Sequence, residues 1–242
     1  MAFVSKVKEF LDKYFFNVSW TCNNCGKEVF NGEYFCDECL NSLAFNNESI
    51  CVHCGRKTIV PEEYCLTCQN RLVNIDIGRS VFNYDGDVKK LILGFKDGNK
   101  RYLSKVFAKY LYEKYKEWDL SADYITYVPM TKKAKRKRGF NQSKLLAIEL
   151  SKLSGIEVKS ILEKAKDTLE QKSLNRAERE KNLKSAFRVI LRKSIKDKTV
   201  LLVDDVTTTG ATAEIIAEKL KRAGAKEVKL LTIASVSATD FS

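Results

Sequence analysis

The chain has 242 residues, 44% of them hydrophobic, and a formal net charge of +12. This length allows one ordinary domain and a small module, and the apolar content predicts a sizeable core. No apolar run approaches the ~20 residues of a membrane-spanning helix, and charged residues in the first turns exclude a secretory signal. We therefore expect a cytoplasmic protein without a membrane span.

The charge is divided unevenly along the chain. Residues 1–70 carry 6 Lys and Arg against 9 Asp and Glu, whereas residues 71–242 carry 37 against 22. A polyanion attracted by the overall field would therefore meet the second segment first. Within residues 1–20, apolar residues at helical spacing predict an amphipathic helix that packs on the rest of the protein, with a membrane-surface role as the alternative.

The eight cysteines form four C-x-x-C pairs: Cys22/Cys25, Cys36/Cys39, Cys51/Cys54 and Cys65/Cys68. Two thiolates at this spacing can bind one tetrahedral metal ion. Four pairs in register without an export signal argue against disulfides or a redox dithiol. We expect a double zinc ribbon over residues 21–72 with two structural Zn²⁺, bound by successive pairs or in cross-braced order. His53 lies inside one knuckle and is expected to face solvent rather than to bind zinc.

Helices and strands alternate in the second segment, residues 73–242. Strands are expected at 123–130, 199–203 and 227–236, and helices at 87–94, 102–116, 142–155 and 211–224. Apolar strands in strand–helix–strand order predict an α/β fold with an open parallel sheet and flanking helices.

The stretch VLLVDDVTTTGAT, residues 200–212, joins an aliphatic strand to two acids and a hydroxyl-rich turn. Asp204 and Asp205 would stand at the carboxyl end of the strand, the usual ligand position in an open parallel sheet. The turn that follows opens a helix, whose amide groups and positive end can hold a phosphate. The carboxylates can accept hydrogen bonds from sugar hydroxyls and help to hold a hydrated Mg²⁺. The stretch therefore predicts a site for a sugar phosphate.

The same stretch resembles the phosphoribosyl-pyrophosphate (PRPP) loop of type I phosphoribosyltransferases. The resemblance implies that Asp204 and Asp205 contact the ribose 2′- and 3′-hydroxyls. The residues that would wrap the 5′-phosphate are Thr207, Thr208, Thr209, Gly210, Ala211 and Thr212. Thr208 stands where purine salvage enzymes of this fold carry a further carboxylate, which argues against salvage of hypoxanthine or guanine.

A double four-cysteine module ahead of such a domain resembles the ComF family of bacterial DNA-uptake proteins. The motifs FKDG (95–98), RGFNQ (138–142) and TLEQKSLNRAEREKNL (168–183) support this resemblance. It implies that the loop at the end of the strand predicted over residues 123–130 faces the pyrophosphate of PRPP. The residues of that loop are Pro129, Met130, Thr131 and Lys132. Thr131 is a departure, because many members have a second proline there.

Six cations lie within seven consecutive positions, 132–138. Such a run is often a solvated, mobile surface loop, and we expect a flexible loop here. It could close as a lid over PRPP and supply cations to the pyrophosphate. It could also serve as a track for a nucleic-acid backbone, with Phe140 available for stacking, and the two roles are compatible. The residues assigned to this lid or nucleic-acid surface are Lys135, Arg136, Lys137, Arg138, Phe140, Asn141, Gln142, Lys96 and Arg179.

The resemblance implies a ComF-like factor of natural transformation that binds PRPP with Mg²⁺ and single-stranded DNA, with a helicase-type competence protein as a further partner. Two alternatives stay open from the sequence. One is a phosphoribosyltransferase of nucleotide metabolism with an unknown acceptor, and the other is a zinc-ribbon regulator that senses PRPP. The fold supports both binding proteins and enzymes, so fold alone does not decide between them.

Overall fold

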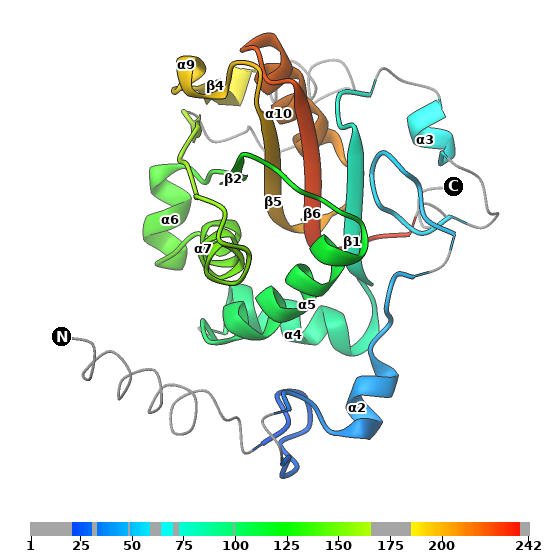
Figure 1. Cartoon of the computed structure of the whole chain (residues 1–242). Helices are drawn as coiled ribbons and strands as arrows, with labels where there is room; N and C mark the ends of the chain where they lie inside the picture. Colours follow the sequence, from blue (N-terminus) through cyan, green and yellow to red (C-terminus); the bar gives the residue numbers. More distant parts are fainter. Residues whose placement is uncertain are drawn as a thin grey trace, which may run out of the picture.

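The fold was analysed in a computed structural model of the whole chain (Figure 1). The structure describes residues 21–30, 33–47, 49–58, 64–69, 73–98, 100–165 and 185–237. The predicted helix in residues 1–20 and the candidate residue Arg179 lie outside these ranges.

A four-stranded parallel sheet lies at the centre of the molecule, in the order β1-β6-β5-β2 (Figure 1). Its strands are β1 (Ile77–Asn83), β2 (Tyr124–Tyr127), β5 (Thr199–Thr207) and β6 (Glu227–Ser235). Three of them match predicted strands, because buried parallel strands appear as unbroken apolar runs in a sequence. The fourth, β1, was not predicted, since Gly78, Arg79 and Ser80 interrupt its apolar pattern.

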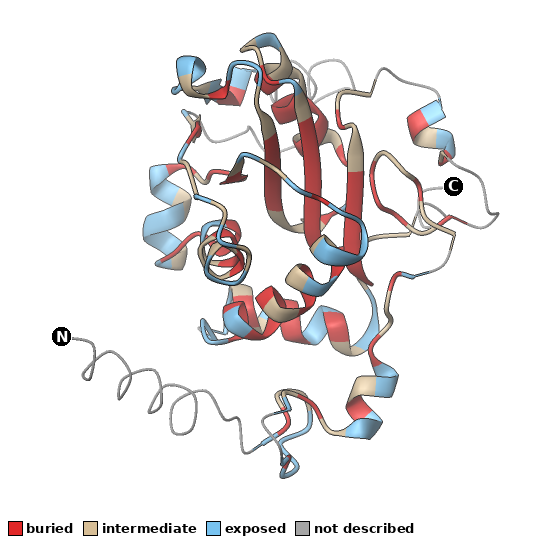
Figure 2. Cartoon of the chain, viewed as in Figure 1, coloured by how far each residue is buried: buried red, intermediate tan, exposed pale blue. Residues whose placement is uncertain are grey.

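Helices cover the two faces of the sheet, and the core is divided accordingly into two layers. Leu201 and Val203 of β5 belong to the layer that includes the apolar sides of α4, α5 and α7. Val200 and Leu202, on the opposite face of the same strand, pack against α10. The helices are α4 (Gly86–Lys96), α5 (Leu103–Glu117), α7 (Gln142–Ser154) and α10 (Ala211–Arg222). Figure 2 shows the buried residues concentrated on these strands and on the inner sides of the helices. The predicted parallel sheet with flanking helices is confirmed.

Smaller elements complete the described part of the chain. An antiparallel pair, β3 (Leu162–Lys164) and β4 (Phe187–Val189), precedes the short helix α9 (Arg192–Ile195). In the cysteine-rich part, α2 (Asp37–Ser42) and α3 (Leu66–Gln69) each start next to a cysteine. Among the described helices, none combines the length and the apolar character that crossing a bilayer requires.

The basic segment is a helix, α6 (Lys132–Arg138), and the prediction of a mobile loop is wrong. Thr131 is the N-cap, and its hydroxyl accepts a hydrogen bond from the amide of Ala134 at 3.2 Å. Gly139 ends the helix in the left-handed conformation, with φ +86°. Lys and Arg are good helix formers, so a seven-residue run between these two caps folds as a helix despite its charge.

The second cysteine-rich ribbon is attached to the outer edge of β1. The amide of Gly78 donates to the carbonyl of Val52, and the amides of Asn46 and Asn83 form backbone bonds across the same edge. Gly78 and Gly55 permit the close approach, since a Cβ on Gly78 would collide with His53 and lie 2.8 Å from the Cys54 carbonyl carbon. The ribbon thereby covers a sheet edge that would otherwise expose unpaired backbone groups.

We expect Gly78→Ala to lower the free energy of unfolding by about 3 kcal/mol, because backbone atoms rather than flexible side-chain ends must move aside. For a chain of this size, the melting temperature should fall by roughly 6–12 °C. Thermal unfolding followed by circular dichroism measures this. Gly94→Ala is the matched control, because its Cβ would touch only the side chain of Lys100, at 3.3 Å. Equal melting temperatures for the two variants would contradict the tight docking of the ribbon on β1.

Candidate functional site

The two adjacent acids lie near the carboxyl end of β5, where the sheet opens. The sequence predicts that the strand ends at Val203, but β5 continues to Thr207 because its pairing with β6 extends that far. On its other side β5 loses its partner earlier, since β2 ends at Tyr127, opposite Val203. Asp204 and Asp205 therefore stand where β5 has a neighbouring strand on one side only, which leaves room for a ligand.

Asp204 is held by a hydrogen bond from helix α7. The Ser143 hydroxyl donates to Asp204 Oδ1 at 2.7 Å, and the amide of Asp205 donates to the same oxygen at 2.9 Å. Burial raises the pKa of Asp204 to about 7, and the charge of Asp205 adds to this, whereas the Ser143 bond opposes it. Among the described residues, no hydrogen-bond partner contacts Asp204 Oδ2. One oxygen of this carboxylate is therefore fixed and the other is available to a ligand.

Asp205 makes an ion pair with the end of helix α4. Lys96 Nζ lies 3.1 Å from Asp205 Oδ2, and the exposed fractions of the two side chains are 20% and 14%. The amide of Val206 donates to Asp205 Oδ1 at 2.6 Å. A partly buried ion pair of this kind holds both groups in place at the sugar-phosphate site predicted from the sequence.

The hydroxyl-rich turn connects β5 to the first turn of α10. Thr207 is buried, Thr208 and Thr209 are exposed, and Gly210 is the N-cap of α10, with φ +75°. The amide of Ala211 donates to Thr209 Oγ1 at 3.4 Å. The exposed hydroxyls thus flank the amino end of a twelve-residue helix, where backbone N–H groups and the helix dipole favour an anion.

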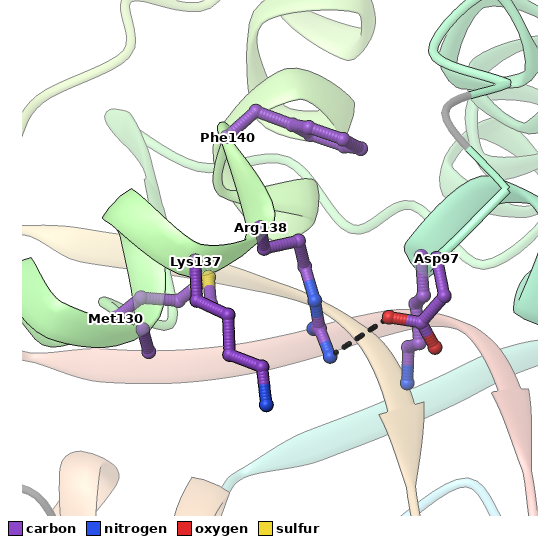
Figure 3. Close-up of a pocket in the computed structure, with 7 residues that line it drawn as sticks. Asp97, Met130, Lys137, Arg138 and Phe140 are labelled. Atoms are coloured by element: carbon purple, nitrogen blue, oxygen red, sulfur yellow. Dashed lines mark ion pairs between the residues drawn. The ribbon is translucent and has the colours of Figure 1, made fainter.

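A pocket of about 360 Å³ lies between the end of α4 and α6. Its lining residues are Lys96, Asp97, Met130, Ala134, Lys137, Arg138 and Phe140. Figure 3 shows Lys137 and Arg138 extending from α6, with Arg138 directed at Asp97 across the gap; the Arg138 Nη2 to Asp97 Oδ1 distance is 3.4 Å. Because Lys96 also pairs with Asp205, the pocket and the acidic pair are neighbours.

Three candidate residues of the motif RGFNQ are buried and join elements of the fold. Phe140 is 7% exposed, packs against Phe95, and lies beneath the guanidinium of Arg101 at 4.7 Å, so the prediction that it is available for base stacking is wrong. Asn141 caps α7 and donates to the carbonyl of Val128. Gln142 donates to the carbonyl of Lys96 at 3.4 Å. These side chains position α6 and α7 relative to the end of α4.

The remaining candidates lie where the sequence indicated, around the same edge. Pro129 and Thr131 are buried and Met130 is half-buried, directly after β2. The exposed cations of α6 are Lys132, Lys133, Lys135, Arg136 and Lys137. The structure therefore brings the acidic pair with the hydroxyl-rich turn, the segment after β2 and the basic helix to one end of the sheet, with Lys96 next to both the acidic pair and the pocket.

The eight cysteines form two separate groups of four, in sequential order. Cys22, Cys25, Cys36 and Cys39 make the first cluster, and Cys51, Cys54, Cys65 and Cys68 make the second. Within each cluster all sulfur atoms lie within 4.8 Å of one another, with a 3.7 Å separation in the first and 3.8 Å in the second. Two thiolates on a tetrahedral Zn²⁺ with Zn–S bonds of about 2.3 Å would be about 3.8 Å apart. The donor set therefore fits two closed zinc sites, and the cross-braced alternative is wrong.

Polar groups around the second cluster were not foreseen from the sequence. Arg56 is 1% exposed and donates to the sulfurs of Cys54 and Cys65, each at 3.4 Å. His53 is not part of either cysteine cluster, as predicted, but it is half-buried rather than fully facing solvent. Its Nδ1 lies 3.1 Å from the carbonyl oxygen of Ile75 and its ring stacks on Tyr64. Hydrogen bonds from Arg56 offset the excess negative charge that four thiolates leave on a zinc site.

We expect Ser143→Ala to raise the pKa of Asp204 above its value of about 7, because the substitution removes a hydrogen bond to the ionised carboxylate. A carboxyl ¹³C NMR titration measures the change directly. Ser151→Ala is the control on the same helix, since Ser151 donates to the carbonyl of Ile156 instead. An Asp204 titration that is the same in both variants would contradict the role of Ser143.

Two family models match the chain. The phosphoribosyl transferase domain matches residues 130–240, and the double zinc ribbon domain matches residues 18–69. The first match covers the segment after β2, α6, the acidic pair and the hydroxyl-rich turn, and the second covers all eight cysteines. The fold is therefore that of the type I phosphoribosyltransferases, preceded by zinc ribbons.

The chain is also similar to three curated proteins. Competence protein F of Haemophilus influenzae is 31% identical over 151 residues, which cover 60% of this chain and 66% of that protein. Competence protein ComFC of Streptococcus pneumoniae is 32% identical over 159 residues, with 64% and 66% coverage. The DNA utilization protein YhgH of Escherichia coli is 38% identical over 109 residues, with 45% and 47% coverage. The matches thus span about two thirds of the two competence proteins and about half of YhgH.

Proposed function

Because this chain belongs to the ComF family, with competence protein F, ComFC and YhgH as homologues, we propose that it is a DNA-uptake factor that binds PRPP and single-stranded DNA. We place its action in the cytoplasm, since two zinc sites built from eight thiolates fit a reducing compartment.

The position of the acidic pair carries the PRPP part of the proposal. Asp204 and Asp205 stand at the open end of β5, and the turn that follows leads into the amino end of α10. Carboxylates accept hydrogen bonds from vicinal hydroxyls, and the helix end favours a phosphate. A ribose 5-phosphate group carries both vicinal hydroxyls and a phosphate, and would therefore suit the two features together.

Magnesium fits the same carboxylates. Mg²⁺ prefers oxygen ligands, keeps several waters, and is commonly bound by one or two carboxylates together with a phosphate ligand. Asp204 and Asp205 are adjacent and partly buried, and Asp204 Oδ2 has no partner among the described residues. Mg²⁺ would add positive charge beside the pyrophosphate of PRPP, while Lys96 and the two aspartates orient the sugar.

The charge of α6 supports the DNA part. Five exposed cations lie on one seven-residue helix that shares an end of the sheet with the acidic pair. Phosphate groups of a nucleic-acid backbone bind such cations and release counterions. The names of the relatives concern competence and DNA utilisation, which agrees with a nucleic-acid ligand.

Calorimetric titration of PRPP with and without Mg²⁺ tests the first part. We expect binding that weakens when Mg²⁺ is removed, and weaker binding of ribose 5-phosphate, which lacks the pyrophosphate. Absence of PRPP binding by folded, zinc-replete protein would refute this part. Release of pyrophosphate that depends on an added acceptor would instead favour a phosphoribosyltransferase.

The salt dependence of oligonucleotide binding tests the second part. In a Lys133→Gln/Lys135→Gln/Arg136→Gln variant, the slope of log affinity against log salt should decrease by about 2, since each phosphate contact on a single strand contributes about 0.7. The matched control replaces three other cations, Arg192, Lys193 and Lys196, with Gln. They precede β5 and therefore lie near its amino end, away from the acidic pair. Equal slopes for both triple variants would exclude α6 as the DNA-binding surface.

A further inference from the structure

Two consecutive residues at the end of α4 connect the acidic pair to the basic helix. Lys96 pairs with Asp205 at 3.1 Å, and Asp97 pairs with Arg138 at 3.4 Å. Lys96 thus supplies a cation to the sugar-phosphate site, and Asp97 supplies an anion to α6. The two residues are neighbours in the chain and line the same pocket, so a ligand that enters there meets both ion pairs.

The pocket at this connection has a surplus of positive charge. Its charged lining groups are Lys96, Lys137, Arg138 and Asp97, and in Figure 3 Lys137 and Arg138 extend from α6 on the side facing Asp97. The side chain of Asp97 is 66% exposed, so an anion that enters from solvent can compete with it for Arg138. Exposed cations continue from this pocket along α6, which suits an extended polyanion better than a single small phosphate.

We propose that the pocket is a second anion site, which takes a phosphodiester of single-stranded DNA, and that Lys96 and Asp97 couple this site to the PRPP site. The inference rests on the proposed function and adds a dependence of each ligand on the other. A phosphodiester that binds Arg138 displaces Asp97. Lys96 then turns toward the same phosphate and leaves Asp205, whose Oδ2 becomes available to the sugar or to Mg²⁺.

The coupling has a defined sign and is reciprocal. Both ligands require the Lys96–Asp205 ion pair to open, since DNA takes Lys96 and PRPP takes Asp205. Whichever ligand binds first has already broken this pair, so DNA and PRPP strengthen each other's binding. By thermodynamic linkage, the factor is the same in both directions. The Arg138–Asp97 pair is solvent-accessible and therefore weak, whereas the Lys96–Asp205 pair is partly buried. Only one of the two pairs is thus easily rearranged, and we expect about a fivefold effect, at the lower end of the range for coupled sites.

The test measures the dissociation constant of PRPP with Mg²⁺, in the absence and presence of saturating oligothymidylate, on the full chain. Wild-type protein should bind PRPP about fivefold more tightly with the oligonucleotide present, and the oligonucleotide about fivefold more tightly with PRPP present. In Lys96→Met and in Asp97→Asn this factor should fall close to one. Glu113→Gln is the control, since it removes one exposed negative charge from α5 without touching either ion pair.

Independent binding of the two ligands to wild-type protein would overturn the coupling and leave the proposed function intact. Competition between them would overturn it as well, and would mean that the pyrophosphate of PRPP occupies the pocket. If wild-type protein bound neither ligand, the proposed function and this inference would fail together. Coupling that persists in Lys96→Met and Asp97→Asn, with folding confirmed by circular dichroism, would exclude these residues as its carriers.

Discussion

PRPP binding is expected to weaken at least about 100-fold in the Asp204→Asn/Asp205→Asn variant. Hydrogen bonds to charged groups contribute about 1.5–3 kcal/mol each, so the loss of two carboxylates amounts to two or more powers of ten in affinity. The variant also removes the carboxylates that fit Mg²⁺ and frees Lys96 from its ion pair. Calorimetric titration with PRPP and Mg²⁺ measures the effect, with wild-type protein as reference.

The stability of the variant protein separates lost binding from lost folding. The pKa of Asp204 is raised to about 7 in the folded protein, first by burial and then by Asp205, against about 3.9 for an unfolded chain. The folded state therefore binds more protons between these values, and the stability that this contributes below pH 4 is lost as the pH rises through 7. An uncharged residue at this position avoids that loss.

We therefore expect Asp204→Asn alone to melt at or above the wild-type temperature at pH 8, with a smaller advantage at pH 5. Thermal unfolding at the two pH values checks this. A buried charge that destabilises the fold while serving a ligand is a common trade-off between stability and function. A lower melting temperature at pH 8, together with lost PRPP binding, would mean that the substitution acts through the fold rather than through the ligand.

The sheet could be predicted where its sequence is apolar, and not elsewhere. Strands β5 and β6 are rich in aliphatic residues, despite Lys229 and Thr232 in β6, because both of their faces are covered by helices. Strand β1 contains a buried Arg79, whose guanidinium lies 3.6 Å from the ring centre of Trp118 and donates to the carbonyls of Val52 and Gly78. A charged residue with such partners looks like a loop residue in the sequence, since Val52 and Trp118 lie far from Arg79 in the chain.

The helix formed by the basic segment had a local signal that its charge obscured. Thr131 and Gly139 have the residue types of an N-cap and a left-handed C-terminal residue, at a spacing of a short helix. The density of cations suggested a solvated loop instead. The two caps and the helix propensity determine the conformation of this segment. The repulsion between the cations is small, because five of the six are exposed to water, which screens their charges.

The site was predictable where its chemistry is local in sequence. The cysteine pairs and the stretch from Val200 to Thr212 carry their chemistry within a few residues. Ser143 and Lys96, in contrast, reach the acidic pair from other elements, and Ser143 is 61 residues away from Asp204. Lys96 was included through the motif FKDG, which also contains Asp97, whereas nothing in the sequence singled out Ser143 or Arg56 as partners.

The two cysteine clusters differ in how they are connected to the rest of the protein. In the second, every cysteine is at most 4% exposed, Arg56 donates to two of the sulfurs, and the ribbon is bonded to β1. In the first, Cys25 is exposed and Cys36 is half-buried, although Cys22 and Cys39 contact the main core. Loss of zinc from the second cluster therefore uncovers the edge of the central sheet, while loss from the first leaves that edge covered.

We expect Cys54→Ser to prevent folding of the chain at physiological temperature, and Cys25→Ser to give a folded protein with one zinc ion instead of two. Structural zinc contributes about 10–16 kcal/mol of apparent binding free energy, comparable to the total stability of a domain, about 5–15 kcal/mol. In Cys54→Ser this loss falls on the ribbon that closes β1, and it leaves the buried Arg56 without one of its two sulfur acceptors. Zinc content by mass spectrometry and thermal unfolding by circular dichroism distinguish the two variants. If Cys25→Ser lost as much structure as Cys54→Ser, the stability of the sheet would depend equally on both clusters. The attachment of the second ribbon to β1 would then not explain why the zinc ion of the second cluster is essential.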